Sequence, residues 1–183
     1  MRAAIVRPTG VERTFDPGSF LVSKTDPKGV ITYANGLFLE VAAYSEEQVL
    51  GRPHNLIRHP DMPRCVFQLL WDRLNNGREV FAYVLNLAGD GAHYWVFAHV
   101  TPSFDRTGRI VGHHSNRRAT DPGAVREIQP LYGRLLAEEK QHSRPSEAMA
   151  GSSALLDKIL ADGSHSYDEF VWSLAGRTAQ ATR

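Results

Sequence analysis

The sequence predicts an α+β domain built on a five-stranded antiparallel sheet, and three observations carry this prediction. A hairpin-like pair of strands opens the domain, a group of short helices follows, and three strand-like segments joined by tight turns close it. Strands joined by tight turns pair antiparallel, because parallel pairing needs long crossover connections. Helices gathered between two groups of strands are typical of a sheet that carries its short helices on one face.

The two opening strands are predicted over residues 19–33. A β-branched and aromatic run ends at the turn Asp-Pro-Lys-Gly at 26–29, and a second run, Val30 to Tyr33, follows at once. Proline presets φ at such a turn and glycine accepts a positive φ, so the chain reverses there. Residues 19–33 are therefore expected to form a β-hairpin.

Helical spacing then replaces strand alternation. Apolar residues recur every three or four positions over 37–44, which predicts a short helix beginning near Asn35. The tetrapeptide Ser-Glu-Glu-Gln at 45–48 resembles a capping box and predicts the start of a second short helix. A longer helix is expected over 63–74, with Asp61 as a candidate for its N-cap.

Three strands are predicted to close the domain, at 80–87, 93–103 and 109–116. The first two flank Asp90-Gly91, a strong hairpin signal. Large side chains alternate on both faces of these strands, so we expect one face to pack on the short helices and the other on flanking segments or a partner.

The C-terminal third is predicted to be helical. An amphipathic stripe runs over 124–140, residues 141–153 have the composition of a polar linker, and short helical pieces follow at 154–160 and 167–174. The last piece, amphipathic and aromatic, is expected either to bind a partner or to fold back on its own domain. The predicted organisation is an N-terminal cap (1–18), the α+β domain (19–120), a flanking helix (121–141), and a linker with a helical tail (142–183).

Composition excludes several classes of function. A net charge of +1 gives no sign of a nucleic-acid-binding surface. Cys65 is the single cysteine, so no intramolecular disulfide is possible, and together with the lack of a signal peptide or membrane span this predicts a cytoplasmic protein. The chain has no phosphate-binding loop, dinucleotide fingerprint or nucleophile motif, so it is not expected to be an enzyme.

Particular segments resemble a known family. Ile31–Phe38 (ITYANGLF) resembles the second-strand and first-helix signature of PAS domains, and Gly51–Pro63 (GRPHNLIRHPDMP) is similar to a segment of the PAS domains of bacterial aerotaxis receptors. Asn86 and Gly91–Val96 match the third and fourth strands of the same family. The likeness extends over about residues 23–132, and it implies that the α+β domain has the PAS fold.

The resemblance implies a sensor that binds FAD non-covalently and reports redox state or oxygen to a signalling protein through a conformational change. The chain departs from the family at Val80, where its flavin binders carry a tryptophan. By resemblance, the residues at or near the flavin are Asn35, Arg58, His59 and Asp61, with His54, Asn86 and Trp95 as further candidates.

Simpler roles stay open for several of these residues. Asn35 is also a candidate N-cap, Asp61 a helix cap or the ion-pair partner of Arg58, and Trp95 a packing residue. Haem is a weaker alternative to FAD, since a lone strand histidine usually faces solvent. The histidines considered for it are His93, His99, His113 and His114.

The alternative function is a PAS module that binds no cofactor, or a small metabolite, and acts by dimerisation or protein contact. In either case we expect a homodimer formed through flanking helices, and a chemotaxis or other signalling protein as the partner.

Overall fold

The computed structural model describes residues 6–181, with side chains to residue 175; the outer ends of the predicted cap and tail, 1–5 and 182–183, lie outside this part. Its centre is one five-stranded sheet with strand order β2-β1-β5-β4-β3 and antiparallel pairing throughout. The strands are β1 (Leu21–Thr25), β2 (Ile31–Ala34), β3 (Val80–Leu87), β4 (His93–Phe104) and β5 (Ile110–Ala119). The predicted α+β class and five-stranded sheet are confirmed.

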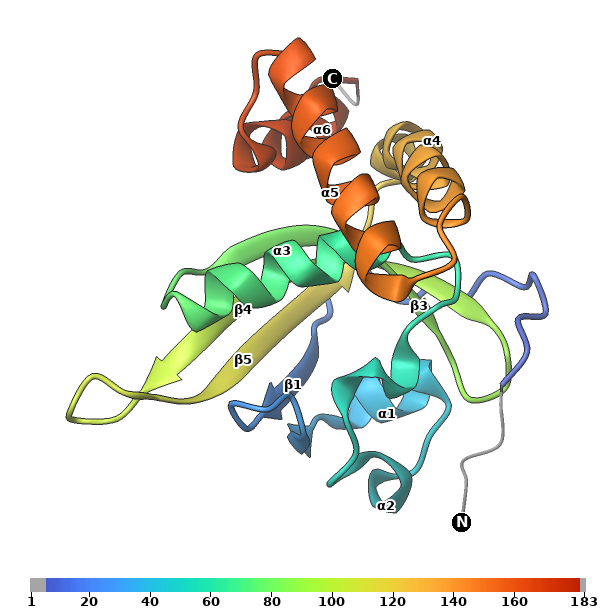
Figure 1. Cartoon of the computed structure of the whole chain (residues 1–183). Helices are drawn as coiled ribbons and strands as arrows, with labels where there is room; N and C mark the ends of the chain where they lie inside the picture. The colour runs from blue at the N-terminus through green and yellow to red at the C-terminus, as the bar shows by residue number, and fades with distance from the viewer. Residues whose placement is uncertain (1–5, 182–183) are drawn as a thin grey trace.

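The short helices lie between β2 and β3 in the chain (Figure 1). They are α1 (Gly36–Ala42), α2 (Glu46–Val49), the 3-10 turn η1 (His54–Ile57) and α3 (Arg64–Asn75). The Asn35 side chain accepts a hydrogen bond from the backbone N–H of Phe38 at the start of α1, and Ser45 and Gln48 form a capping box on α2. Both predicted helix starts are therefore confirmed.

The start of α3 differs from the prediction. Asp61 does not cap this helix; the N-cap is Pro63, which offers no side-chain acceptor. A carboxylate from another helix takes that role: Glu139 Oε1 accepts hydrogen bonds from the N–H groups of Arg64 and Cys65, at 2.6 and 3.4 Å. Glu139 therefore joins α3 to the C-terminal helices.

Three C-terminal helices complete the fold: α4 (Pro122–Glu139), α5 (Pro145–Asp162) and α6 (Tyr167–Ala181). The predicted linker at 141–153 is wrong, because α5 begins at Pro145 and includes most of it. Proline is favoured in the first turn of a helix, and the small side chains of Ala148 and Ser152 are buried, so the segment packs although its composition is polar.

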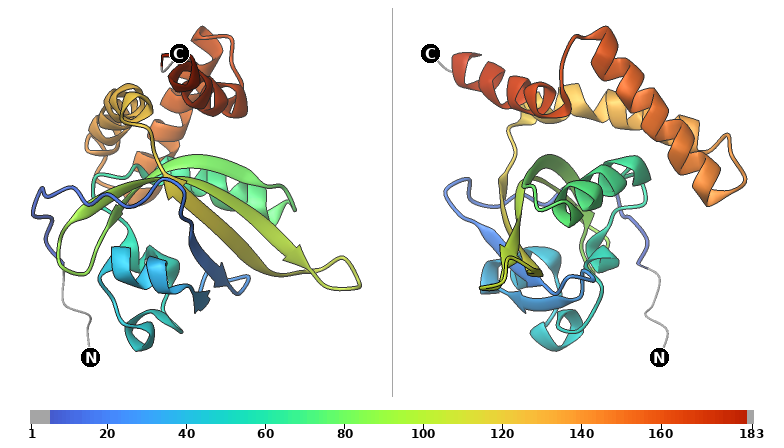
Figure 2. Two further views of the ribbon diagram at one scale, coloured as in Figure 1. Left: turned by 180° about the vertical axis from the view of Figure 1, so that it is seen from behind. Right: turned by 60° about the vertical axis from the view of Figure 1, so that its left-hand side comes forward.

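These helices gather beside β3 and α3 (Figures 1 and 2), where α6 contacts β3 and α5 contacts α3. They cover part of the sheet face that points away from α3. Trp95 stacks on Tyr132 of α4, with ring centroids 6.0 Å apart. Trp172 of α6 packs on Phe81 and Phe97, at 4.8 and 5.6 Å. The aromatic segment of the tail thus folds back on its own domain.

None of the helices in residues 6–181 combines the length and the apolar character that crossing a membrane would require.

Candidate functional site

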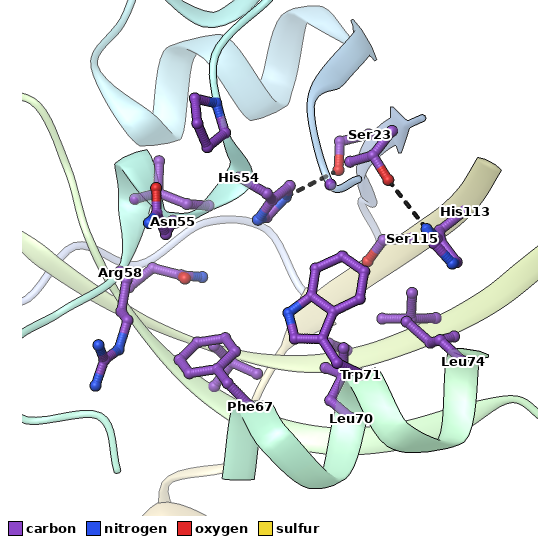
Figure 3. A pocket seen from close by; sticks show the side chains of 18 of the residues that line it. Ser23, His54, Asn55, Arg58, Phe67, Leu70, Trp71, Leu74, His113 and Ser115 are labelled. Carbon is purple, nitrogen blue, oxygen red and sulfur yellow. Dashed lines mark hydrogen bonds between the residues drawn. The ribbon is translucent and has the colours of Figure 1, made fainter. Parts of the chain in front are cut away.

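A cavity of about 420 Å³ lies between α3 and the inner face of the sheet. This volume is in the range of small-molecule binding sites, ~300–1,000 Å³. Much of its wall is apolar, and Figure 3 shows side chains of α3 reaching into it. The apolar lining residues of α3 and the sheet are Phe67, Leu70, Trp71, Leu74, Val84, Ala98 and Val100.

Two aromatic rings of α3, Phe67 and Trp71, form one side of the cavity (Figure 3). The Trp71 ring meets the ring of His113 edge to face, with centroids 5.3 Å apart. It also lies against Gly29 in the β1–β2 turn, where φ is +80° and a Cβ atom would stand 2.9 Å from the indole. Glycine at 29 therefore allows both the positive φ of the turn and the close approach of the Trp71 ring.

The polar end of the cavity is organised by Arg117 of β5. Its side chain donates a hydrogen bond to Ser23 Oγ at 3.0 Å, and its other terminal nitrogen lies 2.7 Å from Nε2 of His54. Arginine can only donate, so His54 Nε2 is the acceptor in this contact. Ser23 Oγ and His54 Nε2 are themselves 3.2 Å apart, which makes the three side chains one network.

Burial shapes the charges in this network. Removal from water and the neighbouring Arg117 guanidinium lower the pKa of His54 to about 3, so the imidazole is neutral at physiological pH. Burial also lowers the pKa of Arg117 to about 10, which still leaves it charged at pH 7. Arg117 is 5% exposed, and its contacts on the described part of the chain are with neutral groups, including the ring face of Phe38.

The cavity as a whole is suited to a negatively charged ligand. Its lining contains Lys28, Arg58, Arg64 and Arg117, and none of its lining residues is an aspartate or glutamate. An anion placed there would meet several cationic side chains and no carboxylate among the lining residues.

Four buried polar atoms on the lining have no hydrogen-bond partner within the described part of the chain. They are Arg58 Nε, Asn86 Nδ2, His113 Nε2 and Ser115 Oγ. Buried polar groups are nearly always paired, so a cluster of unpaired ones around a cavity indicates that a ligand or ordered water supplies the missing partners.

The candidates from the sequence divide into two sets. His54, Arg58 and Asn86 come together on the cavity wall. The amide of Asn35 is already engaged by the backbone: its Oδ1 accepts from the N–H groups of Val22 and Phe38, and its Nδ2 donates to the carbonyl of Phe20.

The remaining candidates lie away from the cavity lining. His59 is buried, its Nδ1 accepts the backbone N–H of Asp61 at 3.1 Å, and the Asp61 side chain is largely exposed. Trp95 points to the opposite face of the sheet, because the register pairs Asn86 with Tyr94 and successive strand residues alternate between faces.

Sequence reasoning missed Trp71, Ser115 and Arg117 as lining residues. A signal for the last two was present, since His113, Ser115 and Arg117 alternate along β5 and so share one face. Of the histidines considered for haem, His113 lies on the cavity, whereas His99 faces Glu79, 2.7 Å away. Residues 6–175 contain no cluster of histidine, cysteine and acidic side chains that could hold a metal ion.

Comparison with known proteins identifies the family. The family model described as PAS fold matches residues 14–114, more than half of the chain. The chain therefore belongs to the PAS fold family. It is 42% identical over 118 residues to the aerotaxis receptor of Escherichia coli K12, an alignment that covers 64% of this chain and 23% of the receptor.

Other relatives are more distant. The nitrogen fixation regulatory protein of Klebsiella pneumoniae is 30% identical over 95 residues, which cover 52% of this chain and 19% of that protein. The chain thus matches less than a quarter of the length of these curated relatives. The light-state structure of the blue-light photoreceptor Aureochrome1 LOV superposes with a TM-score of 0.54 at 22% identity, over 64% of this chain and 91% of that one, and supports the fold.

Proposed function

We propose that this chain is a redox or oxygen sensor that binds FAD non-covalently in the cavity between α3 and the sheet. The observation that carries this proposal is the pairing of an aromatic wall with a buried guanidinium, in a cavity whose lining has no carboxylate. A flavin nucleotide joins a flat aromatic ring system, edged with carbonyl and nitrogen acceptors, to negatively charged phosphates, so it needs both features.

The residues present fit this ligand. Phe67 and Trp71 offer ring faces or edges to the flavin ring. The unpaired donor Asn86 Nδ2 suits a ring carbonyl. Lys28 and Arg64 offer positive charge to the phosphates. His54, Arg58 and Asn86 are the sequence candidates proposed to contact FAD, while Asn35, His59, Asp61 and Trp95 are proposed to support the surrounding structure.

The departure at Val80 is compatible with flavin binding. Val80 is buried at the start of β3 and is not among the lining residues. Trp71 provides an indole from the facing helix instead. We propose that this side chain supplies the aromatic contact that the family's strand tryptophan makes.

Bound flavin would supply reversible uptake of electrons. Reduction would increase the negative charge of the ring, and a nearby guanidinium in a site of low dielectric would favour the reduced form. Because Arg117 also holds Ser23 and His54, a shift of its side chain toward the ring would change the contacts between β1, η1 and β5. This network is the proposed origin of the signal.

The similarity to the aerotaxis receptor supports a role in signalling. We propose that the chain acts in the cytoplasm without catalytic activity, as a homodimer that contacts a chemotaxis or other signalling protein. A module that takes up a different anionic metabolite is the second candidate, favoured by the missing tryptophan at Val80.

The test is a visible absorption spectrum of the purified chain, followed by heat release and identification of any bound chromophore. Apo protein is then titrated with FAD, with FMN and riboflavin as comparisons. Flavin absorption that bleaches on reduction, with FAD bound more tightly than riboflavin, supports the proposal. Protein that stays colourless at saturating FAD would exclude it.

A further inference from the structure

The C-terminal helices contribute directly to the cavity. Met149 of α5 is one of the residues that line it, although α5 lies outside residues 14–114, which match the PAS fold. The half-buried thioether of Met149 therefore faces the same space as Phe67 and Trp71. A ligand that fills the cavity would contact a helix that is not part of the PAS core.

The helix α3 lies between the cavity and this C-terminal unit. One face of α3 carries Phe67 and Trp71 into the cavity. Elsewhere along the helix, Arg73 forms an ion pair with Asp168 of α6 and lies over the ring of Tyr167, 5.2 Å from its centroid. Arg73 therefore connects α3, which forms one wall of the cavity, to α6.

The beginning of α3 is held by a single carboxylate. Glu139 Oε1 accepts the N–H groups of Arg64 and Cys65, and also the hydroxyl of Ser152 in α5, at 3.2 Å. Because Pro63 offers no side-chain cap, loss of Glu139 would leave these donors without their acceptor. One residue therefore links α3, α4 and α5.

The contact between α3 and α5 is partly polar. A second cavity, of about 390 Å³, lies between the two helices, and most of its lining side chains are polar, although the buried Cys65 and Leu156 also line it. A direct side-chain contact there joins Ser153 to Gln68, at 3.4 Å. Polar contacts exchange with water at little cost, so this polar part of the interface opens at a lower free energy than the apolar contacts around Leu156.

We propose that the C-terminal helices close the ligand cavity through Met149 and that occupancy of the cavity controls their docking on α3. This inference rests on the proposed function, since FAD is the ligand considered. A ligand that contacts Met149 only when α5 is docked must stabilise the docked arrangement. By linkage, undocking of α5 must lower the affinity for the ligand by the same factor. Separation of α5 from α3 at an empty or altered site would then expose the surface between these two helices to a partner.

The first experiment is hydrogen exchange of the full chain, read by mass spectrometry, with and without saturating FAD. The proposal expects slower exchange in α5, residues 145–162, and in α6 when FAD is bound. Protection confined to residues 21–119, with α5 and α6 unchanged, would overturn it while leaving FAD binding intact.

The second experiment measures the dissociation constant of FAD in variants. Glu139→Ala removes the shared cap and Met149→Ala removes the wall residue; each is expected to weaken FAD binding by about fivefold or more, as is typical of coupled sites. The controls are Glu138→Ala, whose side chain pairs with His142 just beyond the end of α4, and Lys158→Ala on the exposed side of α5.

The outcomes separate the two proposals. If FAD binds to Glu139→Ala and Met149→Ala with the same affinity as to the wild type, the proposed closure of the cavity by the C-terminal helices is wrong. The proposed flavin sensor is not affected by that result. No binding to wild type would overturn both. If circular dichroism shows that Glu139→Ala does not fold, the FAD affinity of Met149→Ala and the hydrogen exchange of the wild type test the proposal without it.

Discussion

Replacement of Arg117 by methionine should stabilise the empty protein and weaken the binding of FAD. Burial lowers the pKa of Arg117 to about 10, roughly 2.5 units below its usual value, and each unit corresponds to ~1.4 kcal/mol. Because pH 7 lies below this pKa, the guanidinium is charged in the folded and unfolded states, and the full penalty of about 3 kcal/mol applies to the folded state.

The penalty is partly offset by the hydrogen bonds that Arg117 makes to Ser23 and His54, each contributing about 1 kcal/mol. Methionine loses both bonds, but Ser23 Oγ and His54 Nε2 remain 3.2 Å apart and can pair with each other. The net gain is about 1 kcal/mol, which raises Tm by about 2–4 °C in a chain of this size.

The same substitution removes the buried positive charge from the cavity. Hydrogen bonds to a charged group contribute ~1.5–3 kcal/mol, so the dissociation constant of FAD should rise by about tenfold or more. Thermal unfolding of the apo protein and titration by flavin fluorescence measure the two effects. Arg118→Met is the matched control, since Arg118 is exposed on the other face of the sheet, over the Phe97 ring. A lower apo Tm together with unchanged FAD affinity would refute the reasoning.

Three further predictions test the surrounding structure. Gly29→Ala should destabilise the chain by ~1–2 kcal/mol or more in urea unfolding and shift tryptophan emission, because φ is +80° and the new Cβ meets the Trp71 ring at 2.9 Å; unchanged stability would contradict this. The pKa of folded His54 is about 3, whereas unfolded His54 takes up a proton near its usual pKa. The free energy of unfolding of the wild type should therefore fall as pH drops from 7 to 5. In His54→Gln this fall should be smaller by about 2 kcal/mol, and parallel urea-unfolding profiles would show that His54 is protonated in the fold. Tyr132→Phe removes the buried hydrogen bond to the carbonyl of Tyr83, 2.6 Å long, and should lower the free energy of unfolding by about 1 kcal/mol; no loss would mean that this bond does not hold α4 on β3.

Local signals in the sequence predicted the parts of the fold that depend on a few neighbouring residues. The turn at 26–29, the Asn35 cap and the box at 45–48 are each formed by side chains within four residues of one another. Such contacts can be recognised from spacing alone. No such local signal marks Glu139, whose partners lie 74 and 75 positions away in the chain.

The candidate site was only partly predictable, because strand alternation divides residues between two faces without saying which face holds the cavity. Asn86 and Trp95 both belong to the segments that resemble the family, yet one lines the cavity and the other packs on Tyr132. Arg117 and Arg118 lie just beyond the predicted strand 109–116, whereas β5 extends to Ala119 and includes both. The register of β5 buries Arg117 on the cavity face and leaves Arg118 exposed on the other face.

The burial of Arg117 also bears on the choice between a ligand-binding sensor and a module without a ligand. A buried cation without a carboxylate among its contacts destabilises the folded state, and an apolar side chain of similar size would avoid that cost. The hydrogen bonds to Ser23 and His54 do not require a charge, since a neutral donor could make them. A module that acts only through its surface gains nothing from this charge, whereas a site for an anionic, reducible ring does. The cationic lining and the unpaired polar atoms around the same cavity support the same conclusion. The stability lost at Arg117 therefore supports the proposal of a ligand whose negative charge restores it.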